Sequence, residues 1–176
     1  EASWVRLERG RPVIVDSISL PHGVVRLTER YGGDRVAPES YAAMLDEVRQ
    51  ELEAFEARHR IAARVAAGTV QMLGSSGTVT TLAGIHLGLP RYVRALVDGT
   101  TLEFGAIAAL SRRLAGLSLE ERAAHPCVGR ERADLVVAGC AILEAICTTW
   151  PVGRLRVADR GVREGILIGL SGGPAA

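Results

Sequence analysis

Residues 68–84 constrain the fold of this chain more than any other segment. Residues 69–73 alternate and are rich in β-forming side chains, which predicts a strand. Small residues follow at 74–76, and a glycine–threonine pair then opens an apolar helical run. A strand, a small-residue turn and a helix together direct free backbone N–H groups and the positive helix end toward an anion. An ordinary turn in which Ser75 or Ser76 caps the helix has the same pattern, so both interpretations stay open here.

The rest of the pattern predicts an α/β domain of the order ββ(β)–α–β–α–α–α–β–α. Late strands that alternate with helices favour parallel pairing, and the opening strands favour an antiparallel meander, so we expect a mixed sheet with helices on its faces. Ligands of such folds bind beyond the carboxyl ends of the strands. Strands are expected at residues 4–8, 12–19, 69–73 and 154–158, a strand end or helical turn at 24–31, and helices at 38–58, 77–88, 102–114, 118–125, 131–149 and 162–170.

Length and charge limit the classes of protein that fit. A chain of 176 residues forms one or at most two compact domains with a sizeable core. Its net charge of +1 gives no electrostatic reason to expect a nucleic acid or a membrane surface as partner. No apolar run reaches the length that spans a bilayer, and charged residues are spread throughout. We therefore expect a soluble protein with neither nucleic acid nor membrane as partner.

The three cysteines indicate the compartment. Cys127, Cys140 and Cys147 are odd in number and lack the spacing of a metal site. If Cys140 and Cys147 share a helix, they lie about 10.5 Å apart along its axis, which is too far for a disulfide. We expect small core side chains in a reducing cytoplasm.

Four segments, in order along the chain, carry a resemblance to a known family. They are Ser19-Leu-Pro-His-Gly-Val-Val-Arg-Leu-Thr28, Gly74-Ser-Ser-Gly-Thr78, Arg132-Ala-Asp134 with Val137-Ala-Gly139, and Asp159-Arg-Gly-Val-Arg-Glu-Gly165. These segments resemble those of the exopolyphosphatases and guanosine pentaphosphate phosphohydrolases (Ppx/GppA), and a chance match of all four is remote.

The resemblance implies an actin-like, sugar-kinase-like (ribonuclease H-like) fold that is duplicated, with two domains closing over a phosphate chain. Residues 1–170 resemble the second domain, with 171–176 as a frayed tail. We expect the first domain, with its own phosphate loop and catalytic glutamate, to be absent from this chain. An acidic-glycine phosphate loop precedes this domain in the family, and Glu1 falls where its last glutamate would be.

The resemblance further implies a cytoplasmic phosphatase, active in the stringent response, that uses Mg²⁺ and water to hydrolyse terminal phosphoanhydride bonds of polyphosphate or guanosine pentaphosphate. The isolated chain is expected to be inactive. Its expected partners are the substrate, the first domain and a second copy in a homodimer. The implied catalytic and metal-binding residue is Glu1, and the implied phosphate or nucleotide ligands are Gly74, Ser75, Ser76, Gly77, Thr78, Arg26 and Arg163.

Alternatives stay open for these assignments. An N-terminal glutamate such as Glu1 is usually a solvated charge. Arg26 and Arg163 are equally suited to structural ion pairs. A non-catalytic polyphosphate- or nucleotide-binding regulator of the same fold is the second functional hypothesis, and a sugar or acetate kinase of the superfold fits the four segments less well.

Overall fold

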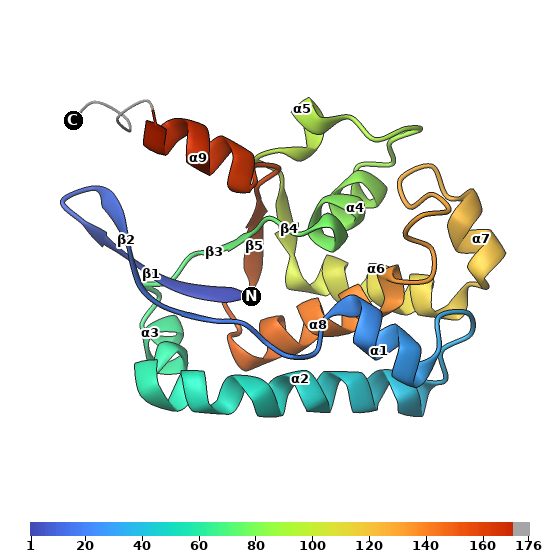
Figure 1. The fold of residues 1–176 in the computed structure, drawn as a ribbon, viewed down its shortest axis with the longest axis horizontal. Helices are drawn as coiled ribbons and strands as arrows, with labels where there is room; N and C mark the ends of the chain where they lie inside the picture. The colour runs from blue at the N-terminus through green and yellow to red at the C-terminus, as the bar shows by residue number, and fades with distance from the viewer. Residues whose placement is uncertain (171–176) are drawn as a thin grey trace.

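A computed structural model describes residues 1–170, and Figure 1 shows the arrangement of its strands and helices. The predicted tail at 171–176 lies outside the described residues. The first elements along the chain are β1 (Ala2–Glu8), β2 (Arg11–Ile18), α1 (Val24–Tyr31), α2 (Pro38–His59), α3 (Ile61–Ala66), β3 (Met72–Gly74) and α4 (Gly77–His86). The later elements are α5 (Arg94–Val97), β4 (Thr101–Glu103), α6 (Phe104–Gly116), α7 (Leu119–Ala124), α8 (Val136–Thr149), β5 (Arg154–Val157) and α9 (Val162–Leu170).

Helix α8 is the centre of the helical layer, and its sequence is almost wholly apolar. It packs against α2, α6, α1 and α4, and most of its residues are buried. Its one charged residue, Glu144, accepts a hydrogen bond from the Tyr41 hydroxyl of α2. Burial raises the pKa of Glu144 above its ordinary value. A helix apolar on nearly all sides needs this many neighbours to remove its surface from water.

The main sheet has the strand order β3-β5-β4, with β3 parallel and β4 antiparallel to β5. This is the mixed sheet that the sequence predicts. Leu102, Leu155 and Val157 are buried, and α4 packs against β4 and β5 as well as against α6 and α8 (Figure 1). None of the described helices is long and apolar enough to cross a bilayer.

The opening strands correct one expectation, because they form a two-stranded sheet of their own instead of joining the main sheet. Arg9 (φ 51°) and Gly10 (φ 79°) make the tight turn between β1 and β2. Positive φ at both central residues is what a two-residue type I′ hairpin turn requires. The sequence therefore predicts the hairpin correctly, but the expectation that the hairpin joins the main sheet is wrong.

Several element boundaries also differ from the sequence prediction. The β4 strand was not predicted, because three residues are too few to show an alternating pattern. The strand expected at residues 69–73 covers only Met72–Gly74. A left-handed Arg60 (φ 51°) separates α2 from α3. Helix α8 begins five residues later than expected, after a turn at Gly129 (φ 72°).

Candidate phosphate-binding site

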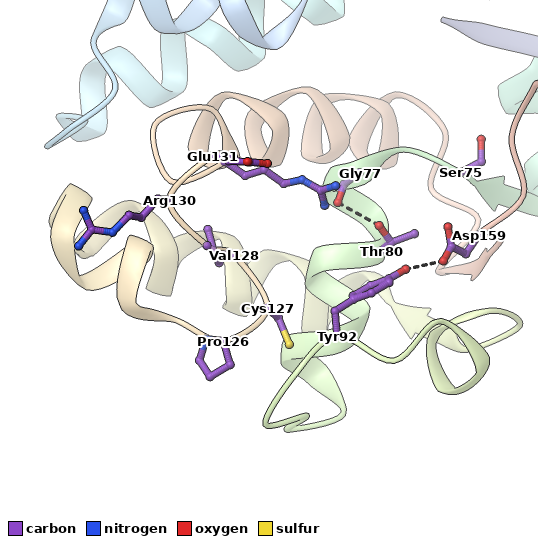
Figure 2. Close-up of a pocket in the computed structure, with 12 residues that line it drawn as sticks. Ser75, Gly77, Thr80, Tyr92, Pro126, Cys127, Val128, Arg130, Glu131 and Asp159 are labelled. Atoms are coloured by element: carbon purple, nitrogen blue, oxygen red, sulfur yellow. Dashed lines mark hydrogen bonds between the residues drawn. The ribbon is translucent and has the colours of Figure 1, made fainter.

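A cavity of about 520 Å³ lies where α4 begins, beyond the carboxyl ends of β3 and β5 (Figure 2). This is the side of the sheet at which the sequence places a ligand. Four segments line it: the start of α4, the loop that carries Tyr92, the loop and turns at 126–132, and the residues that follow β5. The lining residues are Ser75, Gly77, Thr80, Tyr92, Pro126, Cys127, Val128, Gly129, Arg130, Glu131, Arg132 and Asp159.

The start of α4 combines a serine cap with free backbone donors. The Ser76 hydroxyl accepts from the Val79 N–H at 3.2 Å, and the Thr80 N–H donates to the Ser76 carbonyl at 3.1 Å. The N–H groups of Gly77 and Thr78, which precede these two, are the donors that a helix leaves unpaired at its first turn. The two interpretations of this turn are therefore compatible, because a capped helix still presents two N–H groups.

The two glycines of this loop have different roles. A Cβ on Gly74 would lie 2.7 Å from Leu155 Cδ1 and 2.9 Å from Val79 Cγ2, so glycine is required there for packing between β5 and α4. A Cβ on Gly77 would meet nothing closer than the Arg132 guanidinium at 3.7 Å. Gly77 lines the cavity, whereas Gly74 does not. The predicted loop is thus part packing element and part cavity wall.

Thr78 faces the protein interior instead of the cavity. Its side chain lies against Gly139 of α8, where any Cβ would collide with the Thr78 hydroxyl. Ser75 is exposed and lines the cavity. Among the predicted loop residues, Ser75 and Gly77 are therefore the two that the structure places on the cavity surface, and Thr78 offers only its backbone N–H.

Arg132 is the cavity residue whose role the sequence reasoning missed. It precedes α8, and its guanidinium stands beside Gly77 and donates to the Thr81 hydroxyl at 3.4 Å. Arg132 belongs to none of the ion pairs found among residues 1–170. A helix N-terminus beside a cation that has no carboxylate paired to it favours an added anion. Its position in the Arg-Ala-Asp match was the available signal.

The opposite wall is held in place by a hydrogen-bonded network. Tyr92 donates to Asp159 Oδ2 at 2.6 Å, as Figure 2 shows. Arg94 donates to the Asp159 carbonyl and pairs with Glu164 Oε1 at 2.6 Å. Burial is the main cause that raises the pKa of Tyr92 to about 12, and the hydrogen bond to Asp159 is the second cause. The Tyr92 hydroxyl therefore stays neutral and acts as a donor. Asp159 is thus engaged by Tyr92 and Arg94.

The other predicted site residues lie outside the cavity lining. Glu1 is exposed at the start of β1. Arg26 is exposed on α1 and donates to the Pro21 carbonyl at 3.2 Å. Arg163 is exposed on α9. The structure thus brings Ser75, Gly77 and Arg132 together, and the roles of the other three residues stay predictions.

Carboxylates are the groups of this cavity that could hold a magnesium ion. Mg²⁺ in phosphoryl-transfer sites is held by one or two carboxylates together with phosphate oxygens and water. In residues 1–170 no group of three histidine, cysteine or acidic side chains is placed to hold a metal ion. The cavity carboxylates are Glu131 and the already bonded Asp159.

A capped helix N-terminus and an arginine without an ion pair among residues 1–170 lie beyond the parallel strands of this α/β domain, an arrangement that suits a phosphate group. The chain belongs to the Ppx/GppA phosphatase family, whose model matches residues 9–172. "Exopolyphosphatase 2" of Mycobacterium tuberculosis is 26% identical over 168 residues, covering 93% of this chain and 51% of the relative. The chain spans about half the length of the curated relatives it matches.

Solved structures agree with this assignment. An Aquifex aeolicus Ppx/GppA phosphatase matches with a TM-score of 0.76 and 27% identity, covering 89% of this chain and 50% of that one. An exopolyphosphatase from Cytophaga hutchinsonii matches with a TM-score of 0.75 and 22% identity, covering 92% of this chain and 51% of that one. The actin-like α/β fold predicted from the sequence is confirmed.

Proposed function

We propose that this chain is the second domain of a longer phosphatase that hydrolyses terminal phosphoanhydride bonds of inorganic polyphosphate, of guanosine pentaphosphate, or of both. The observation that carries the proposal is the placement of Arg132 beside the first turn of α4, with no carboxylate paired to it among residues 1–170. Such a site suits a phosphate group, because backbone N–H groups and a guanidinium donate to different oxygens of one phosphate.

The residues of this chain would bind and orient the phosphate chain. The N–H groups of Gly77 and Thr78 and the Arg132 guanidinium would hold one phosphate, while the hydroxyl of Ser75 adds a donor at the edge. The network of Tyr92, Asp159 and Arg94 fixes the opposite wall, which limits the movement of the bound chain.

Mg²⁺ and the attacking water belong to the same proposal. Magnesium would neutralise charge on the phosphate oxygens, and a carboxylate would orient the water. We propose that Glu1 contributes one carboxylate and that a first domain, outside this chain, contributes the others and closes the cleft. The residues described here therefore supply binding, and the isolated chain would not hydrolyse these substrates. A cytoplasmic location and pairing of two copies complete the proposal.

A second candidate is a regulator that binds polyphosphate or a nucleotide without hydrolysis. The engagement of Asp159 by Tyr92 and Arg94 favours it, because one of the two cavity carboxylates is then already bonded and only Glu131 is left to activate water. The two candidates differ in turnover and agree on binding, so one experiment separates them.

The test is phosphate release from polyphosphate and from guanosine pentaphosphate, with and without Mg²⁺, by the longer protein and its Arg132→Gln variant. We expect Mg²⁺-dependent release, with KM raised by about tenfold in the variant because one charged donor is lost. Arg112→Gln, at an exposed α6 position that does not line the cavity, is the matched control and should behave as the unaltered protein. Tight binding without release would favour the regulator, and neither binding nor release would exclude both.

A further inference from the structure

The charged side chains that line the phosphate cavity are two arginines and two carboxylates, so their formal charges cancel. They are Arg130, Arg132, Glu131 and Asp159. A phosphate group is negatively charged at neutral pH, and a carboxylate in the same cavity opposes its binding. A cavity suited to phosphate therefore benefits from a further cation beside one of these carboxylates.

Arg94, at the start of the short helix α5, supplies such a cation beside Asp159. Its Nε atom lies 3.4 Å from Asp159 Oδ2 and donates to the Asp159 carbonyl at 2.9 Å. Arg94 is not among the residues that line the cavity, and its side chain is 49% exposed. The guanidinium can thus offset the charge of Asp159 without occupying the space that a phosphate would fill.

Arg94 also pairs with Glu164, which keeps the guanidinium in place. Glu164 Oε1 lies 2.6 Å from Arg94 Nη2, and Glu164 Oε2 accepts from the Gly161 N–H at 2.8 Å. Glu164 stands in the first turn of α9, where the positive helix end offsets part of its charge. The pKa of Glu164 falls to about 2, first because of the bond from Arg94 and then because of the bond from Gly161. Glu164 is therefore ionised at neutral pH and fixes the direction of the Arg94 side chain.

Tyr92 connects the charge of Asp159 to the side of the cavity where Arg132 stands. Its hydroxyl points toward Asp159 and donates to Oδ2 at 2.6 Å (Figure 2). Burial is the main cause that raises the pKa of Tyr92, and Asp159 raises it further, whereas the charge of Arg132 lowers it. The charges of Asp159 and Arg132 therefore act on one hydroxyl, so a change of charge at Asp159 should be felt by an anion beside Arg132.

We propose that Arg94 is a positioning residue for phosphate binding, which acts through Asp159 by offsetting the negative charge of its carboxylate. The inference rests on the proposed function, because it requires that the cavity bind phosphate.

A second ion pair on the same two segments provides the contrast. Arg160 pairs with Asp98 at 3.0 Å and links the end of α5 to the residues after β5. Neither Arg160 nor Asp98 lines the cavity. Loss of the Arg160 pair would remove an equal charge and a similar link, yet it would leave no cavity carboxylate unpaired.

Binding of inorganic tripolyphosphate to the longer protein, measured by titration calorimetry without Mg²⁺, tests this role. Arg94→Gln should weaken binding about tenfold at low salt, because the Asp159 carboxylate then opposes the phosphates. The loss should fall below about threefold at about 0.5 M salt, which screens exposed charges. Arg94→Lys keeps the charge and should bind within about threefold of the unaltered protein. Arg160→Gln is the matched control and should bind as the unaltered protein does.

The double variant Arg94→Gln/Asp159→Asn separates the charge of Arg94 from its structural contacts. An asparagine still accepts from Tyr92 but carries no charge, so the double variant should bind within about threefold of the unaltered protein. A double variant as weak as Arg94→Gln would mean that Arg94 only holds the backbone of Asp159, and this would overturn the inference.

Two further results would also overturn it. Equal losses in Arg94→Gln and Arg160→Gln would mean that any lost cation on these segments has the same effect. Unchanged binding in Arg94→Gln would remove the role of Arg94 and leave the proposed function in place. Failure of the unaltered protein to bind tripolyphosphate would contradict the proposed function and the inference together.

Discussion

Two arginines ten residues apart, Arg122 and Arg132, show how different two regions of this molecule are. Arg122 of α7 is fully buried, and it donates to the Ala133 and Leu117 carbonyls at 2.7 Å and to the Asp34 carbonyl at 2.6 Å. Arg132 is exposed in the cavity, with one long hydrogen bond to Thr81. The N–H donors of Arg122 are used by carbonyl groups of the chain itself, whereas most donors of Arg132 are left for another partner.

The difference separates a structural cation from a binding one. Arg122 also donates to the Gly33 carbonyl, so it joins the loop after α1, the end of α6 and the segment before α8 through backbone oxygens alone. Burial lowers the pKa of Arg122 below its ordinary value, although an arginine remains charged. A buried charge is tolerated when its donors are all used, whereas unused donors in a cavity favour an anion.

The largest expected effect is the loss of hydrolysis in the isolated chain, because the cavity around Arg132 is proposed to bind phosphate without supplying the catalytic groups. Residues 1–176 should fold, because the helical layer around α8 is complete, yet release phosphate at least about a hundredfold more slowly than the longer protein. Glu1 at a chain end lacks the backbone that would hold its carboxylate. Phosphate release with Mg²⁺ checks this, and turnover within about tenfold of the longer protein would place the whole chemistry in these residues.

Removing the buried guanidinium should have the largest effect on stability. Arg122→Met should lower the free energy of unfolding by about 3–5 kcal/mol, because it leaves several buried carbonyls without donors. The matched Arg132→Met should change it by less than about 0.5 kcal/mol, since that side chain is exposed. Denaturant unfolding of both variants gives the two values. Equal losses would mean that the two arginines do not differ as described.

A smaller effect is expected from filling the cavity at Gly77. Gly77→Val should weaken polyphosphate binding by the longer protein by about tenfold, roughly 1.4 kcal/mol, by blocking approach to the N–H groups of α4. The fold should be unaffected, because the nearest atoms to an added Cβ are those of Arg132 at 3.7 Å. Gly105→Val, in the first turn of α6 with nothing near it, is the control. Unchanged affinity in a folded Gly77 variant would remove the loop from the binding site.

The smallest effect is expected at the buried cysteines of the protein core. Cys140 and Cys147 are buried as the sequence predicts, and burial raises the pKa of each to about 12. Almost no thiolate is present near neutral pH, so neither should react with a thiol reagent in the native protein. All three cysteines are free, so reductant should not change stability. Rapid labelling of both would show that α8 is exposed.

Sequence patterns were most successful where a local rule decides the structure. Ser118 and Glu121, three residues apart, form a capping box at the start of the helix expected at 118–125, and Ser76 caps α4. The apolar sequence of α8 accounts for its burial, because a helix without a polar face needs cover on all sides. The strand-turn-helix pattern at 68–84 predicted the position of the cavity, since carboxyl ends of parallel strands meet at one edge.

Only the tertiary structure decided which residues meet. The chain by itself determined the α/β class, the hairpin and the helix end that faces an anion, because those depend on periodicity, turns and caps within a few residues. It did not determine that Arg132 stands beside Gly77, 55 positions away, or that the buried Arg122 donates to the Asp34 carbonyl, 88 positions away. Nor did it determine that β1 and β2 form a sheet of their own, separate from the sheet of β3, β5 and β4. Packing sets these contacts, and residues far apart in sequence carry no local pattern that records their distance in space.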